Sequence, residues 1–104
     1  MKVITVCGSL RFKKEMMEIT EKIGLQGNCM LTPIFTTKES KSDYTENEIS
    51  ILSEMHFQKI KMCDAILVVN VNGYIGEQTK KEIEYAKYLN KEIIYYTDII
   101  NNEI

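Results

Sequence analysis

Hydrophobic residues follow two different periods along this chain. Continuous β-branched and apolar runs, KVITVC at 2–7 and AILVVNV at 65–71, have the length and composition of buried strands. Shorter runs at 28–31 and 93–97 predict two further strands. Between these runs, apolar residues recur every three or four positions, which is the period of a helix that covers a sheet.

Three helices are predicted between the strands. The inward positions of the first are Phe12, Met16, Ile19 and Ile23, with Gly24 and Gly27 at its end. Those of the second are Ile49, Leu52, His56, Ile60 and Cys63. Thr45 and Glu48 have the spacing of a capping box, so this helix begins there and ends at Asp64. The third covers 77–90, and residues 98–104 form an edge element or a frayed end.

Strands that alternate with helices are typical of a parallel sheet with helices on both faces. We therefore expect one domain over 1–104, a three-layer α-β-α fold of the flavodoxin or Rossmann type with a four- or five-stranded parallel sheet. Ligands of such sheets bind beyond the carboxyl ends of the strands, where the strand order reverses. The turns at 8–11 and 72–79 follow the first and third strands, so we expect them to form one site.

Composition and charge restrict the kinds of partner and the location that we expect. The net charge of the 104 residues is −2 and no basic block occurs, which argues against a nucleic-acid polymer as partner. No apolar stretch reaches the length of a signal peptide or a membrane span, so a cytoplasmic protein is expected. Cys7, Cys29 and Cys63 are far apart and lack C-x-x-C spacing, which predicts small buried thiols in a reducing cytoplasm. We expect no metal site and no cofactor.

The first turn combines features of an anion site. Gly8 allows a ligand close to the backbone, and Ser9 with the amide of Leu10 opens a helix. Arg11 adds a positive charge. The alternative is a tight turn in which Ser9 serves only as a helix cap.

The second turn offers contacts to a sugar or a base. Its candidate substrate-binding residues are Asn72, Gly73, Tyr74, Gly76 and Thr79. The ring of Tyr74 is suited to stacking. Thr79 and Glu82 have the spacing of a capping box, which gives Glu82 a structural explanation. A carboxylate near a helix start also stays ionised, which suits a nucleophile.

Two further polar residues lie in the apolar pattern. His56, the single histidine, is either a core residue or a group that transfers protons in the site. Asp64 precedes the third strand, where a carboxylate accepts backbone hydrogen bonds, so we expect a structural role for it.

With these residues the chain resembles the nucleoside 2-deoxyribosyltransferase-like superfamily, which includes the deoxynucleoside 5'-monophosphate N-glycosidases. The resemblance covers most of the chain and rests on CGSLR at 7–11, DAILVV at 64–69, GYIGEQTKKEIEYA at 73–86 and NK at 90–91. It implies an N-glycosidic reaction on a nucleoside or its 5'-monophosphate. The third block is the most specific of the four.

The resemblance also implies roles for individual residues. Glu82 corresponds to the family's catalytic glutamate, which attacks the sugar C1' carbon, expels the base and forms a covalent glycosyl-enzyme. The residues that hold the 5'-phosphate or hydroxyl are Gly8, Ser9 and Arg11. His56 replaces a usual aspartate and is assigned the transfer of protons, and Thr5 replaces a frequent tyrosine. A homodimer or higher homo-oligomer is implied, with the site near the interface.

Three hypotheses therefore remain. The chain is an N-glycosidase or deoxyribosyltransferase with Glu82 as nucleophile, or a nucleotide-binding module that has lost catalysis. In the third, it is a structural protein in which Glu82 only caps a helix.

Overall fold

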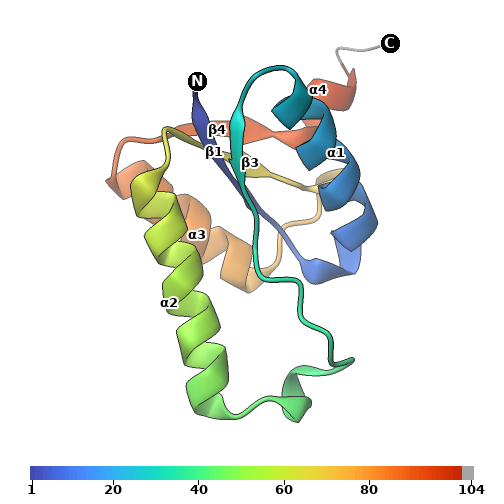
Figure 1. Ribbon diagram of the computed structural model, residues 1–104, viewed down its shortest axis with the longest axis vertical. Helices are drawn as coiled ribbons and strands as arrows, with labels where there is room; N and C mark the ends of the chain where they lie inside the picture. The colour runs from blue at the N-terminus through green and yellow to red at the C-terminus, as the bar shows by residue number, and fades with distance from the viewer. Residues whose placement is uncertain (102–104) are drawn as a thin grey trace.

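The computed structural model describes residues 1–101 and shows a parallel sheet with helices on both faces (Figure 1). Its four strands are β1 Val3–Cys7, β2 Cys29–Leu31, β3 Ala65–Val68 and β4 Glu92–Tyr95. They lie in the order β2-β1-β3-β4, and every pair is parallel. The predicted three-layer, Rossmann-like α/β fold is confirmed, with four strands.

The strand order reverses between β1 and β3. From β1 the chain moves outward to β2 and then returns to the other side of β1, where β3 and β4 follow. Cys7 pairs with Val68, and the Cys7 carbonyl accepts a 2.8 Å hydrogen bond from the Val69 amide. The turns after β1 and β3 therefore start side by side, at the position where ligands bind in folds of this kind.

The amino ends of the same two strands are joined by a side chain. The Val3 amide donates a 2.8 Å hydrogen bond to Asp64 Oδ2. The structural role predicted for Asp64 is confirmed.

The helices cover the two faces unequally. α1 Lys13–Leu25 and the short α4 Tyr96–Asn101 pack on one face, and α2 Glu46–Met62 and α3 Glu77–Tyr88 pack on the other (Figure 1). The buried residues of the α1 face are Ile4, Val6, Met16, Ile19, Ala65, Leu67 and Val69. Those of the α2 and α3 face are Cys7, Ile60, Cys63, Ile66, Val68, Ile83 and Ala86. Alternate residues of β1 thus enter different layers, and Cys7 belongs to the α2 and α3 layer.

The start of α2 is as predicted. The Glu48 amide donates to Thr45 Oγ1 at 3.0 Å, and the Thr45 amide donates to Glu48 Oε1 at 2.9 Å. These two hydrogen bonds form the capping box. A 3-10 turn, Lys41–Asp43, lies in the polar loop before it.

The carboxyl-terminal end of the chain differs from the prediction. The run 93–97 was expected to be a strand, yet Tyr96 and Thr97 begin α4. Tyr95 pairs with Val68, the last residue of β3, so the chain beyond Tyr95 has no ladder partner. Instead the Thr97 amide donates to Asn70 Oδ1 at 3.2 Å, and Ile99 packs against the α1 face. Of the run 98–104, residues 102–104 lie outside the described residues.

Other boundaries move by a few residues. β3 ends at Val68 instead of residue 71, and a 3-10 turn, Val71–Gly73, follows it. Gly24 lies inside α1, since that helix continues to Leu25. The prediction that all three cysteines are buried is wrong for Cys29, which is exposed because β2 is an edge strand.

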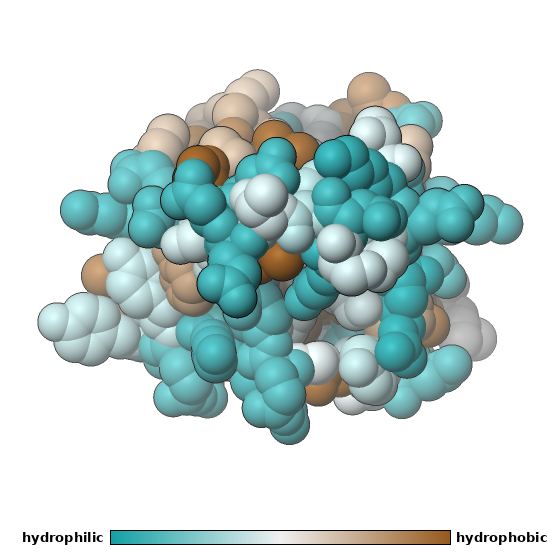
Figure 2. All heavy atoms as spheres, turned by 90° about the horizontal axis from the view of Figure 1, so that it is seen from below, coloured by the Kyte–Doolittle hydropathy of each residue, from teal (hydrophilic) through white to brown (hydrophobic). Residues whose placement is uncertain are grey.

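The surface is mainly polar. Figure 2 shows a face on which hydrophilic side chains dominate and small hydrophobic patches lie between them. Within residues 1–101, no helix combines the length and the apolar character that crossing a bilayer requires.

Candidate active site

The helical period of α3 places Glu82 inside the protein. The four buried residues of this helix are Thr79, Glu82, Ile83 and Ala86. Their spacing puts them on one face, which packs against the sheet. Glu82 is therefore only 6% exposed, although it is a carboxylic acid.

The capping explanation for Glu82 is wrong. The N-cap of α3 is Gly76, and no side chain caps this helix. Thr79 and Glu82 both lie inside the helix, because it begins at Glu77. The burial of the Glu82 carboxyl group therefore requires another explanation, and its neighbours suggest one.

Three elements bring Cys7, His56 and Glu82 together. α2 is tied to β1 by a 2.9 Å hydrogen bond from Thr5 Oγ1 to the carbonyl of Lys59, one turn beyond His56. Cys7 Sγ lies 3.4 Å from His56 Nε2, and the same nitrogen lies 3.6 Å from Glu82 Oε1. All three side chains are buried, and their ligand atoms lie within 4.8 Å of one another. We call this group the Cys7–His56–Glu82 cluster.

Burial keeps the cluster close to neutral. It raises the pKa of Glu82 to about 7 and lowers the pKa of His56 to about 4. Burial, followed by the charge of Glu82, raises the pKa of the Cys7 thiol well above its usual value. The helix dipole was expected to keep Glu82 ionised, but this residue lies in the second turn of α3, where desolvation outweighs the dipole.

The geometry is not that of a nucleophile–histidine–acid relay. Such a relay places the nucleophile at one ring nitrogen and the acid at the other. Here Cys7 Sγ and Glu82 Oε1 both face Nε2 of His56. The Nδ1 atom of His56 is buried, and no group of residues 1–101 makes a hydrogen bond to it.

An exposed side chain links the cluster to α2. Gln78 is exposed, and its Nε2 donates to Glu82 Oε2 and to Ser53 Oγ, both at 3.4 Å. These are long hydrogen bonds, so moving this side chain costs little.

The two glycine-containing turns are in contact, as predicted. The Arg11 guanidinium lies over the Tyr74 ring, 4.4 Å from its centroid. Phe12 packs edge-to-face on the same ring, with centroids 5.8 Å apart. A stacked guanidinium keeps its in-plane N–H groups available, and none of them has a carboxylate partner in the part of the chain that the structure describes.

Ser9 acts as a cap in the first turn. Its Oγ accepts a 3.4 Å hydrogen bond from the Arg11 amide, and its carbonyl accepts one from the Phe12 amide at 2.9 Å. The result is a 3-10 turn, Leu10–Phe12, before α1 begins. The hydroxyl hydrogen of Ser9 and the guanidinium of Arg11 remain as donors for an anion.

A substitution at Gly8 tests how closely this turn packs. An added Cβ would lie 3.1 Å from the Val69 carbonyl oxygen and 3.1 Å from Met16 Cε. The methionine can move, but the carbonyl belongs to the sheet. We expect Gly8→Ala to lower the free energy of unfolding by about 1–3 kcal/mol. Urea denaturation measures this loss of stability. Gly27→Ala is not a suitable control, because the φ of Gly27 is 101° and an alanine would be strained there.

The matched control is Gly24→Ala, since Gly24 lies within α1 and its added Cβ would approach only Met30 Cγ, a side-chain atom, at 3.3 Å. Alanine also favours the helix there. An equal loss of stability in both variants would contradict the close packing at Gly8.

The remaining predicted contacts differ in accessibility. Leu10 is 41% exposed and Tyr74 is 42% exposed. Asn72 and Gly73 are exposed and have φ values of 55° and 80°. Thr79 is buried inside α3, so it is the member of the predicted set that is least accessible to a ligand.

Two residues of this region, Cys7 and Gln78, were not predicted as site residues. Cys7 could have been recognised from the alternation of β1, because Thr5 and Cys7 share the face that α2 covers. Gln78 lies one helical turn before Glu82, a spacing at which side chains meet.

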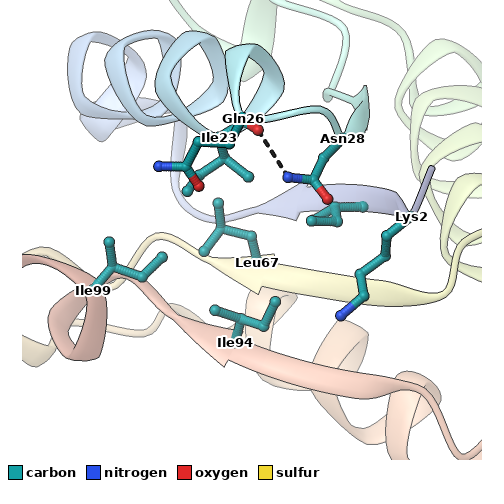
Figure 3. Close-up of a pocket in the computed structure, with 8 residues that line it drawn as sticks. Lys2, Ile23, Gln26, Asn28, Leu67, Ile94 and Ile99 are labelled. Atoms are coloured by element: carbon teal, nitrogen blue, oxygen red, sulfur yellow. Dashed lines mark hydrogen bonds between the residues drawn. The ribbon is translucent and has the colours of Figure 1, made fainter.

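A separate hollow lies on the opposite face of the sheet. Its volume is about 190 Å³, and it is enclosed by α1, α4 and the strands (Figure 3). Its lining includes Ile23, Leu67, Ile94 and Ile99, and the Asn28 side chain donates to the Ile23 carbonyl at its rim. The sheet separates it from the Cys7–His56–Glu82 cluster.

Comparison with known proteins relates the fold to that of an enzyme. No protein-family model and no curated protein sequence matches this chain. Among solved structures, a 2-desoxiribosyltransferase from Leishmania mexicana superposes with a TM-score of 0.66 over 92% of this chain, at 16% sequence identity. The chain spans 64% of that neighbour's length. The two chains share a Rossmann-like α/β fold.

Proposed function

We propose that this protein cleaves or transfers the N-glycosidic bond of a nucleoside, or of its 5'-monophosphate, with Glu82 as the nucleophile. One observation carries the proposal. The Glu82 carboxyl group is buried beside Cys7, the residue that leads directly into the Gly8–Arg11 turn. A carboxyl group and a candidate phosphate site thus lie at the same sheet edge, in a fold shared with a 2-desoxiribosyltransferase.

The proposed chemistry follows retaining glycosidases. The ionised carboxylate attacks the C1' carbon of the sugar as the bond from C1' to the base nitrogen breaks. The base leaves with that electron pair and takes a proton from solvent, and the attacking water or second base later returns one to solvent. Water, or a second base, then attacks C1' and releases Glu82 as a carboxylate.

In this proposal His56 handles the proton. Its imidazole is neutral at pH 7 because its pKa is about 4. Nε2 lies 3.6 Å from Glu82 Oε1, so the imidazole can relay the proton that the carboxyl group must lose before it attacks. With a pKa of about 4 against about 7 for Glu82, His56 passes this proton on and does not retain it. Gln78, which donates a long hydrogen bond to the other oxygen of Glu82, would give up this bond to the substrate.

The test is release of free base. Deoxynucleosides, ribonucleosides and their 5'-monophosphates are incubated singly with the protein, and again in the presence of a second free base, and the products are separated by chromatography. We expect base release from at least one of them. Base exchange without net hydrolysis identifies a transferase, and no release from any member of the panel refutes the proposal.

Arg11 is expected to select the phosphorylated substrate. Its guanidinium is oriented by Tyr74, and a charge-assisted hydrogen bond to phosphate contributes about 1.5–3 kcal/mol. Arg11→Ala should lower kcat/KM for the 5'-monophosphate by about 10- to 100-fold and leave the nucleoside almost unchanged. Lys14→Ala is the control, because Lys14 is an exposed cation on α1. Equal losses for both substrates would contradict phosphate recognition by Arg11.

A second candidate function is nucleotide binding without catalysis. The observation that favours it is the burial of Glu82, which keeps about half of this group protonated near neutral pH. This alternative predicts saturable nucleotide binding by calorimetry with no free base. It also predicts that Arg11→Ala weakens that binding.

Self-association and a cytoplasmic location belong to the same proposal. α2 exposes Ile51, Met55 and Met62, three apolar side chains on one helix. Sedimentation of the purified protein distinguishes a dimer from a monomer of 12.1 kDa.

A further inference from the structure

The Cys7–His56–Glu82 cluster has a property that glycosyl transfer does not use. A thiol, an imidazole and a carboxyl group point at one another inside the protein, from β1, α2 and α3. Both neighbours of His56 face the single atom Nε2. Donor atoms that converge on one point are what a metal ion requires.

We propose that the Cys7–His56–Glu82 cluster binds a divalent metal ion, with Zn²⁺ as the preferred ion. Cysteine sulfur, histidine nitrogen and carboxylate oxygen are the three ligand types of zinc in proteins. Three protein ligands leave the fourth tetrahedral position for water or another small molecule.

Two of the three distances between ligand atoms match a zinc site, and all three atoms lie within 4.8 Å of one another. Zinc lies about 2.3 Å from sulfur and about 2.0–2.2 Å from nitrogen or oxygen, so ligand atoms of a tetrahedral site are about 3.4–3.6 Å apart. Cys7 Sγ and His56 Nε2 are 3.4 Å apart, and His56 Nε2 and Glu82 Oε1 are 3.6 Å apart. Ions that prefer six oxygen ligands, such as Mg²⁺, do not suit this set of donors.

The charges also fit. A neutral imidazole has a lone pair at Nε2, and the low pKa of His56 keeps it neutral at pH 7. The cation would stabilise the thiolate of Cys7 and the carboxylate of Glu82, the two forms that burial alone disfavours. Binding releases the thiol proton, and the carboxyl proton where present, to solvent.

No metal site was expected from the sequence, because short ligand spacings are absent. Residues 7, 56 and 82 belong to three separate elements, and no local motif connects them. Only the packing of α2 and α3 on β1 reveals the group.

Cobalt substitution tests the inference. The protein is stripped with EDTA, dialysed and titrated with Co²⁺, followed by Zn²⁺. We expect one Co²⁺ per chain, with a thiolate-to-cobalt charge-transfer absorption and intense visible bands of tetrahedral cobalt. Zn²⁺ should remove both absorptions and raise the Tm. A wild-type protein without the charge-transfer absorption overturns the inference.

Variants identify the ligands. Cys7→Ser should abolish the charge-transfer absorption, and Cys29→Ser, which changes the exposed cysteine, should retain it. His56→Gln should weaken Co²⁺ binding by at least about tenfold. An absorption that survives Cys7→Ser but not Cys29→Ser shows binding at the surface and overturns the inference. Circular dichroism confirms that each variant is folded.

The metal inference does not depend on the glycosidic reaction. The titration contains no nucleotide, so cobalt binding by a protein whose EDTA-treated form releases no base refutes the proposed function alone. Base release by the EDTA-treated protein without a cobalt signal refutes the metal site alone. If the protein both binds cobalt and releases base, Zn²⁺ should inhibit base release, because it binds the carboxylate that must attack C1'.

Discussion

Glu82→Gln is expected to lower kcat for base release by at least about a thousandfold, with the protein still folded. Glutamine has nearly the same shape as glutamate, so it fills the same space beside Cys7 and His56. Its amide oxygen is a much poorer nucleophile and cannot carry the negative charge that stabilises a positive sugar. Chromatography of the released base, with the substrate that wild type cleaves best, measures the loss.

The control is Glu84→Gln, which changes an acid of the same helix that points to solvent. The Glu84 side chain is 75% exposed and lies 3.6 Å from Lys87 at the surface, a pair of little energetic consequence. Glu84→Gln should retain wild-type activity. Substantial base release by Glu82→Gln would exclude Glu82 as the nucleophile, whatever the control does.

The fold was predictable because its signals are local. The runs that became β1 and β3 are continuous and apolar, since these strands are buried on both faces. The start of α2 follows from the spacing of Thr45 and Glu48 alone. The start of α4 at Tyr96 was not predictable, because it depends on where β3 ends and on the Asn70 side chain.

The candidate site was predictable only in part. The pairing of the turns at Arg11 and Tyr74 follows from the general rule for parallel sheets. The position of Glu82 depends on the residue at which α3 begins. The apolar pattern predicts a start at Glu77, as observed, whereas the capping spacing of Thr79 and Glu82 favours a start after Thr79. The contact of His56 with Glu82 is tertiary, since α2 and α3 must pack side by side before it exists.

The stability of Glu82→Gln should depend strongly on pH. In wild type the pKa of Glu82 is about 7 when folded, against 4.5 ordinarily, so the folded state holds a proton that the unfolded chain releases between these values. The contribution of Glu82 to the free energy of unfolding is fully present below pH 4.5 and is lost as the pH rises to about 7. The loss amounts to about 3 kcal/mol, and Glu82→Gln does not incur it.

His56 makes the stability of the protein depend on pH in the opposite direction. Its pKa is about 4 when folded against 6.5 ordinarily, so its contribution is complete above pH 6.5 and is lost as the pH falls to about 4. In wild type the two effects nearly cancel between pH 4.5 and 6.5. In Glu82→Gln only the histidine effect remains, so the variant gains stability over this range while wild type stays almost level.

Urea denaturation at pH 5 and pH 8.5, with EDTA present, measures the difference between the two proteins. We expect Glu82→Gln to gain about 3 kcal/mol relative to wild type between these pH values, and Glu84→Gln to gain none. The groups that face Glu82 are Cys7, His56 and Gln78, and all three are unchanged in the variant. A constant difference across the pH range would mean that Glu82 is ionised when folded. The carboxylate would then be ready to attack C1' without first losing a proton, and His56 would have no proton to take from it.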